Sequence, residues 1–256
     1  MKIVEPKSFI VGETVSRNDE MDAALEEIGA KGWQTDASIF GEKLIEFGGR
    51  LCYLSFEPGL NRNVTRVRKG WRPYIKNILE SGHGSVLEHA CVNVVFTNVT
   101  KVFTHELIRH RAGSSYSQVS GRFVLWNDLG MWIPPSIRDD PDLVEELVSA
   151  FMDAEEHMQN FEDLSGLESA ESFSEKKKLT STRRRISPEG AATHILCGFN
   201  HRAWRHVFTM RCDPSAEEEI AFVLGPLLKR FQGAWPALYE DIKLLGNEIN
   251  VDYKKV

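Results

Sequence analysis

Apolar side chains recur every three to four residues along much of the chain, and this period predicts amphipathic helices. One clear case is the stretch 64–79, where Trp71, Ile75 and Ile78 share a face. Near the C-terminus an apolar stripe runs through 220–245, and Pro226 and Pro236 are expected to kink or split it. In all, helices are expected over residues 21–28, 39–51, 64–79, 100–111, 140–161 and 200–212, and within 220–245.

Strands are expected where β-branched residues gather or alternate with polar ones. Residues 91–99 (CVNVVFTNV) fit this pattern, residues 122–126 fit it more loosely, and residues 195–199 form a short apolar run that ends at Asn200. Asparagine is a good N-cap, so the next helix is expected to start there. The small residues of 112–117 predict a loop, and the polar, serine-rich stretch 163–175 predicts an exposed connection.

Taken together, these elements predict an α+β fold, a helix-rich single domain with a small central antiparallel or mixed sheet. We expect one catalytic domain over residues 1–256, in which residues 1–40 form a variable lead-in. No apolar run approaches the roughly 18 residues of a membrane span. The first residues, MKIVEP, are too polar for a signal peptide, and four cysteines without metal-ligand spacing are typical of reduced thiols. A cytoplasmic protein that binds no membrane is expected.

The formal net charge of −6 argues against a general nucleic-acid-binding protein, which is usually basic. Anionic small ligands are still compatible with this charge, because the arginines are concentrated locally. Three short clusters hold Arg109, Arg111, Arg122, Arg183, Arg184, Arg185, Arg202, Arg205 and Arg211.

The segment 109–123 carries the most chemical information. Arg-His-Arg ends a predicted helix, and serines, a glutamine and a further arginine follow it. Arginines with hydroxyls and loop N–H groups suit a phosphate and a heterocycle. Basic residues at the C-terminal end of a helix also interact favourably with its dipole and can simply be solvated. Composition alone leaves these two interpretations equally open.

The segment RHRAGSSYSQVSGRF resembles the signature of flavin-dependent thymidylate synthases, which is Arg-His-Arg, seven residues and then serine. Here eight residues separate Arg111 from Ser120, a lengthening by one within 112–115. Residues 83–89 resemble the family's His-x-x-x-x-Glu-His segment, and residues 200–211 resemble its Asn-x-Arg…His…Arg helix. Arg184 falls where the family has a nucleotide-binding arginine. Four motifs thus agree in order over about residues 75–235.

The resemblance implies reductive methylation of dUMP to dTMP, with methylenetetrahydrofolate as carbon donor, NADPH as reductant and bound FAD. It also implies a homotetramer. By position, the implied FAD contacts are Ser85, Arg109, His110, Arg111, Gln118, Asn200, Arg202 and His206. The implied dUMP contacts are Glu106, Arg109, Gln118, Val119, Ser120, Gly121, Arg122, Arg184 and Arg211. Arg211 is the implied catalytic residue; its guanidinium is too basic to take up a proton, so we expect it to act as a fixed positive charge beside the uracil.

Helical spacing adds one expectation of its own. At about 100° per residue, Arg202 and His206 point within about 40° of each other, whereas Arg211 lies about 180° from Arg202. We therefore expect this helix to lie between two sites, with active sites shared between subunits.

Other functions fit part of the pattern. One alternative is a flavin-dependent pyrimidine-nucleotide hydroxymethylase on the same scaffold, and another is a non-catalytic nucleotide- or RNA-binding module. A catalytic cysteine, as in the unrelated cysteine-dependent thymidylate synthases, has no evident companion base in the sequence. A zinc helix is disfavoured because His105 and His110 are spaced i, i+5 rather than i, i+4, so no metal is expected.

Overall fold

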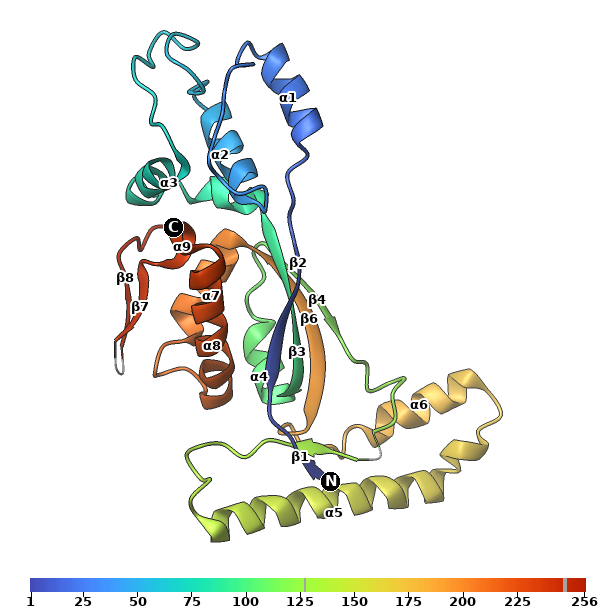
Figure 1. Ribbon diagram of the computed structural model, residues 1–256. Coiled ribbons are helices and arrows are strands. Elements are labelled where there is room, and N and C mark those ends of the chain that lie inside the picture. The colour runs from blue at the N-terminus through green and yellow to red at the C-terminus, as the bar shows by residue number, and fades with distance from the viewer. Residues whose placement is uncertain (127, 246–247) are drawn as a thin grey trace.

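The computed structural model describes residues 1–126, 128–245 and 248–256. Its centre is a four-stranded antiparallel sheet in the order β2-β3-β6-β4 (Figure 1). The strands are β2 (Lys7–Glu13), β3 (Cys91–Thr100), β6 (Ala192–Asn200) and β4 (Ser114–Gln118). β3 and β6 are the long central pair, and they hold β2 on one edge and β4 on the other.

One face of the sheet is buried because the central strands alternate. In β3, Val92, Val94 and Phe96 are fully buried, while the residues between them are partly exposed. This face packs against α4 (Lys101–Leu107), α7 (His201–Arg211) and α8 (Glu218–Ala234), which lie together on one side of the sheet (Figure 1). The main hydrophobic core therefore lies between the sheet and these helices.

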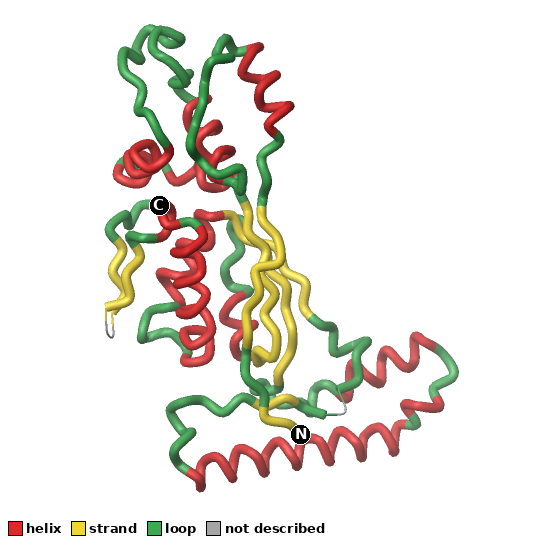
Figure 2. The backbone as a smooth tube through the Cα atoms, viewed as in Figure 1, coloured by secondary structure: helices red, strands yellow, loops and turns green. Residues whose placement is uncertain are grey.

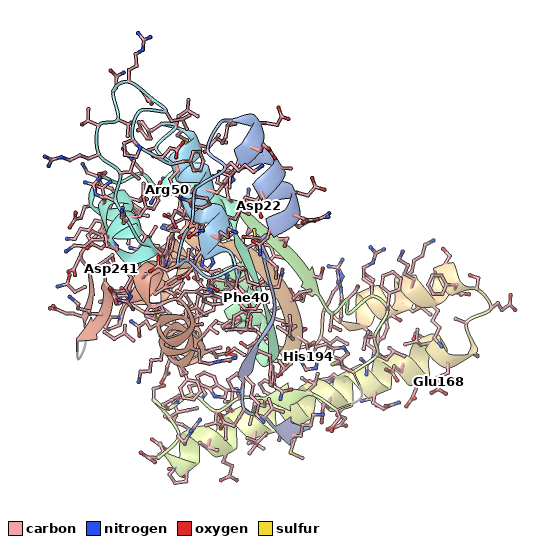
Figure 3. All side chains as sticks on the ribbon, turned by 45° about the horizontal axis from the view of Figure 1, so that its top comes forward. Asp22, Phe40, Arg50, Glu168, His194 and Asp241 are labelled. Atoms are coloured by element: carbon pink, nitrogen blue, oxygen red, sulfur yellow. The ribbon has the colours of Figure 1, made fainter. Side chains whose placement is uncertain are left out.

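The C-terminal elements extend this layer. α9 (Pro236–Tyr239) follows α8, and a hairpin of β7 (Ile242–Leu245) and β8 (Glu248–Val251) comes next. Arg205 of α7 and Asp241, which is labelled in Figure 3, form a buried bidentate ion pair with N–O distances of 2.6 and 2.8 Å. Arg205 also donates to the carbonyl of Leu238. This ion pair fixes the start of the hairpin against α7.

A helical lobe stands at one end of the sheet, at the top of Figure 1. It contains α1 (Asn18–Glu27), α2 (Glu42–Leu51), α3 (Trp71–Glu80) and the 3-10 helix η1 (Gly84–His89). Arg50, labelled in Figure 3, is 2% exposed and donates to Glu46 and to the carbonyls of Ser55 and Arg68. One buried guanidinium therefore holds the long connection between α2 and α3.

A second group of helices lies at the opposite end of the sheet (Figure 2). It contains α5 (Pro141–Ser165), the 3-10 helix η2 (Leu167–Ser169) and α6 (Phe173–Arg183), and the short parallel pair of β1 (Lys2–Ile3) and β5 (Gly130–Met131) lies beside it. Asp140 caps α5 by accepting from the N–H groups of Asp142 and Leu143. A small separate core around Phe151 and Met158 joins this group to the sheet end.

The predicted α+β class and the helices over 21–28, 39–51, 140–161 and 200–212 are confirmed within a few residues at each end. Residues 91–99 and 195–199 form strands as expected, and Asn200 caps α7. The expected helix over 64–79 begins only at Trp71. The helix over 100–111 ends at Leu107, and Arg109, His110 and Arg111 follow it. In the part of the chain that the structure describes, none of the helices is both long and apolar enough to cross a membrane.

Four expectations were wrong. Residues 112–117 were expected to be a loop, but Ser114–Gln118 is strand β4, because its serines can pair along the edge of β6. Residues 122–126 form no strand. The stretch 163–175 was expected to be a connection, but it includes the end of α5, all of η2 and the start of α6. The apolar stripe is helical only to Tyr239, and its last part is strand β7.

Candidate functional site

Two pockets lie at the two ends of the short edge strand β4. The first, here called the RHR pocket, has a volume of about 480 Å³. Its walls come from the ends of α4 and β6, the first turns of α7 and the C-terminal segment. It is lined by Glu88, Arg109, His110, Arg111, Ala112, Gly113, Asn200, Arg202, Ala203, His206, Lys254, Lys255 and Val256.

The second, here called the Ser120 pocket, has a volume of about 580 Å³. It lies past the other end of β4 and reaches toward α5 and α6. Its lining includes Lys101, His105, Gln118, Val119, Ser120, Gly121, Arg183, Arg184, Arg185 and Ser187. Because β4 has five residues, the two pockets are about 16 Å apart along the strand.

The Arg-His-Arg segment is held from both sides. Upstream, the side chain of Thr100 caps α4 by accepting from the N–H of Phe103. Downstream, the hydroxyl of Tyr116 in β4 lies 2.9 Å from the carbonyl oxygen of Leu107 and 2.5 Å from that of His110. Strand pairing of β4 therefore determines where the residues after α4 point.

Asn200 joins the sheet to α7 at the RHR pocket. Its N–H donates to the carbonyl of Gly113 at 3.0 Å, and its side-chain oxygen accepts from the N–H of Ala203 at 2.8 Å. Because this cap sets the first turn of α7, Arg202 and His206 reach the same pocket from successive turns. Arg202 pairs there with Glu88 at 2.6 Å.

Arg211, at the end of α7, turns toward His110. Its Nε donates to Nε2 of His110 at 2.9 Å, its Nη1 pairs with Glu106 Oε2 at 2.5 Å, and its Nη2 donates to the carbonyl of Glu106 at 3.2 Å. An arginine has no acceptor, so Nε2 of His110 carries no proton and its imidazole is neutral with Nδ1 protonated. Burial, the Arg211 guanidinium and then His206 lower the pKa of His110 to about 4.

In the Ser120 pocket, cations gather beside the turn after β4. Lys101 donates to the hydroxyl of Ser187 at 2.7 Å, and burial and the nearby Arg184 lower its pKa, against the opposing effect of Glu189. The side chain of Arg184 passes beside Gly121, where an added Cβ would lie 3.4 Å from its Cδ. Arg183, by contrast, is buried in an ion pair with Glu162. Arg184 therefore lies next to this turn, whereas the guanidinium of Arg183 is held by Glu162.

The residues predicted from the sequence divide between these pockets. The RHR pocket brings together Arg109, His110, Arg111, Asn200, Arg202 and His206. The Ser120 pocket brings together Gln118, Val119, Ser120, Gly121 and Arg184. Ser85 lines a neighbouring pocket that shares Arg202 with the RHR pocket. Glu106 and Arg211 lie directly behind His110, and Arg122 lines neither pocket.

The expectation from helical spacing holds only in part. Arg202 and His206 line the RHR pocket and Arg211 does not. However, Arg211 contacts His110, whose ring centroid is 5.4 Å from that of His206. The backbone of Arg211 faces away from Arg202 and His206, but its long side chain reaches back to His110, which lies beside His206.

Several lining residues were not singled out as site residues from the sequence. Lys101 and His105 of α4 line the Ser120 pocket, and Lys254 and Lys255 line the RHR pocket. For the two C-terminal lysines the sequence held no signal. Their contact with a pocket whose other residues lie about 50 or more positions earlier depends on the path of the hairpin.

Of the cysteines, Cys197 and Cys212 are buried, and Cys52 and Cys91 are exposed. Among the described residues no group of three or more His, Cys, Asp or Glu side chains could hold a metal ion.

The structure is that of an α+β protein with two pockets, rich in arginine and lysine side chains, at the two ends of one edge strand, and such linings suit anionic ligands. Comparison with known proteins identifies the family. Residues 37–237 match the family model described as "Thymidylate synthase complementing protein". The chain is 36% identical over 217 residues to the flavin-dependent thymidylate synthase of Mycobacterium avium, covering 83% of each, and 36% identical over 216 residues to that of Mycolicibacterium gilvum. The chain belongs to the flavin-dependent thymidylate synthase family.

A solved structure supports the fold independently. The chain superposes with a TM-score of 0.65 on a UMP/dUMP methylase, PolB from Streptomyces cacaoi, bound with 5-Br dUMP. The match covers 94% of this chain and 96% of that one at 15% identity. At this identity the likeness shows a shared architecture.

Proposed function

We propose that this protein methylates dUMP to dTMP in the cytoplasm, with methylenetetrahydrofolate as carbon donor, NADPH as reductant and FAD as cofactor. Residues 1–256 act as one catalytic domain. The observation that carries the proposal is the convergence of Arg109, His110, Asn200, Arg202 and His206 on one pocket, in a chain of this family. Arg109 and His110 follow α4, whereas Asn200, Arg202 and His206 lie at the end of β6 and in α7, about 90 positions later in the sequence.

The donor set of the RHR pocket fits a flavin dinucleotide. FAD carries a pyrophosphate, which needs several cationic or N–H donors. The pocket supplies the guanidinium groups of Arg109, Arg111 and Arg202, and among its lining residues Glu88 is the one carboxylate side chain. The amide of Asn200 and the neutral imidazole of His110 suit the uncharged parts of the ligand. The redox chemistry belongs to the flavin, and the protein supplies orientation and electrostatics.

Arg211 acts as a fixed charge. Contacts to Glu106 and His110 hold its guanidinium in one orientation, so little reorganisation is needed when negative charge develops nearby. A uracil placed beside it loses its N3 proton more readily, and C5 of the anionic ring is the more nucleophilic. His110, neutral at physiological pH, positions Arg211 without adding a competing positive charge.

The separation of the pockets supports active sites shared between subunits, and the family resemblance supplies the homotetramer. The implied dUMP contacts Glu106, Arg109 and Arg211 lie at one end of β4, and Ser120, Gly121 and Arg184 lie at the other. One nucleotide cannot contact both sets within one chain across about 16 Å. The Ser120 pocket of one subunit therefore completes the RHR pocket of another.

The function is tested by product analysis. Purified protein incubated with dUMP, methylenetetrahydrofolate, NADPH and FAD is expected to form dTMP, and Arg211→Ala is expected to form none while still binding flavin. A 5-hydroxymethyl product would replace the proposal with the hydroxymethylase alternative. RNA binding without any flavin binding would replace it with the non-catalytic one.

Shared sites have a separate test. Arg184→Ala and Arg211→Ala remove residues from different pockets, so each variant alone is expected to be inactive. After the two are mixed under conditions that let subunits exchange, one site in four receives both intact halves by random assortment. Recovery of about a quarter of the wild-type activity supports sharing. No recovery, with exchange verified by differently tagged chains, contradicts it.

A further inference from the structure

The C-terminal segment 254–256 forms one wall of the RHR pocket, although it lies outside the residues that match the family model. That match ends at residue 237. Lys254, Lys255 and Val256 nevertheless line the pocket together with Arg202 and Asn200. Resting on the flavin proposed above, we propose that Lys254 and Lys255 bind the pyrophosphate of FAD and so add to the cofactor site a part that lies outside the residues matching the family model.

The segment is anchored rather than trailing. The buried carboxylate of Asp241, already paired with Arg205, lies 3.4 Å from the N–H of Tyr253, which donates to it. This contact fixes the backbone one residue before Lys254. The segment then packs against Gly82, in the turn before η1, and against Gly84, the first residue of η1. It can come this close because neither residue has a side chain.

Close packing at these glycines shows how tightly the wall is built. A Cβ added at Gly84 would come within 2.9 Å of Arg202 Nε and 3.3 Å of the Cα of Val256. One added at Gly82, where φ is +69°, would lie 3.2 Å from the Cβ of Lys255. The segment therefore lies between the loop before η1 and the first turn of α7, which carries Arg202.

Charge and position select the pyrophosphate as the partner of the lysines. His110, in contact with the fixed charge of Arg211, marks the reacting end of the pocket. Arg202 lies nine residues before Arg211 on α7, about 13 Å from it along the helix axis, so the wall that holds Arg202 is the end of the pocket farther from Arg211. Lys254 and Lys255 lie at that far end and are exposed, so their ammonium groups are available to a ligand. Because Arg202 is already paired to Glu88, the two lysines add uncompensated positive charge at this wall, besides that of Arg109 and Arg111.

The test compares FAD with riboflavin, which has the same ring but no phosphate. Lys254→Gln/Lys255→Gln keeps most of each side chain and removes both charges. Its Kd for FAD, measured by flavin fluorescence, is expected to rise about 10- to 100-fold, while its Kd for riboflavin stays within about twofold of wild type. Lys229→Gln, an exposed lysine of α8, serves as the matched control and is expected to change neither. Lys254→Arg/Lys255→Arg is expected to retain FAD binding.

The outcomes separate this inference from the proposed function. Wild-type affinity for FAD in the Gln double variant overturns the role of the lysines but leaves the flavin site intact. Equal weakening of FAD and riboflavin also overturns it, because the segment would then act by shape alone. A wild-type protein that binds no flavin overturns both the inference and the function on which it rests.

Discussion

Gly113 is the point at which the lengthened signature meets the RHR pocket, so Gly113→Ala is the most informative single substitution. Its φ is +66°, a left-handed conformation that side chains rarely adopt. An added Cβ would lie 2.2 Å from Nδ2 and 2.8 Å from Cγ of Asn200. Asn200 would have to move, and its side chain caps α7. The substitution therefore strains the backbone and displaces the cap at once.

The magnitude follows from these two parts. A left-handed alanine costs about 1–2 kcal/mol, and loss of an asparagine cap costs about 1 kcal/mol, so we expect about 2–3 kcal/mol in the free energy of unfolding. Gly59→Ala is the matched control, since Gly59 has φ +92° but no atom within 4 Å of an added Cβ. It should lose only the backbone part, about 1–2 kcal/mol. Urea denaturation of both variants measures the difference.

A double-mutant cycle isolates the collision with Asn200. In an Asn200→Ala background the colliding amide is absent, so Gly113→Ala should cost no more than Gly59→Ala does. The reasoning is refuted if Gly113→Ala costs the same with and without the Asn200 side chain. It is equally refuted if Gly113→Ala and Gly59→Ala are indistinguishable in the otherwise wild-type protein.

Three further predictions follow from the ion pairs and from the perturbed histidine. Asp241→Ala leaves Arg205 buried without its partner and should lower the free energy of unfolding by about 3–5 kcal/mol, whereas Asp252→Ala, in an exposed pair, should change it by less than about 1 kcal/mol. Arg211→Gln removes a positive charge from His110, so the pKa of that histidine, followed by NMR, should rise from about 4; an unchanged value would refute the assigned contact. Because the pKa of His110 is below its ordinary value of 6.5, the folded state binds fewer protons than the unfolded state between about pH 6.5 and 4. Stability should fall as pH falls through that window, and less steeply in His110→Gln.

The local pattern of residues was sufficient to predict a helix or strand wherever the structure depends on residues within that same element. The alternation in residues 91–99 predicts β3 because every second side chain enters the core. Asn200 marks the start of α7 because its cap depends on a residue only three positions ahead. The motifs around Arg109 and Arg202 could be assigned to one site because they matched family segments. Their convergence on one pocket depends on the pairing of β6 with β4, which the sequence does not display.

The pattern of residues did not predict the structure where it depends on contacts with segments far away in the sequence. Ser114–Gln118 is too polar to suggest a strand, and it becomes one because β6 offers a free edge. Residues 242–245 continue an apolar stripe of helical period, yet they form β7, since pairing with β8 satisfies their backbone groups. Lys254 and Lys255 carry no motif at all, and only the path of the hairpin brings them to the pocket.

The lengthened part of the signature, within residues 112–115, leads directly into β4. β4 pairs with β6 in uninterrupted register from Ser114 opposite Phe199 to Gln118 opposite Ile195, so the strand itself contains no bulge. A slip of one residue inside the strand would turn Tyr116 away from Phe199, against which its ring now packs edge-on, and would release its hydroxyl from the carbonyls after α4. The left-handed conformation of Gly113 lets the chain bend at that point. The bend at Gly113 and the regular pairing of β4 together lead the chain to Gln118, which lines the Ser120 pocket.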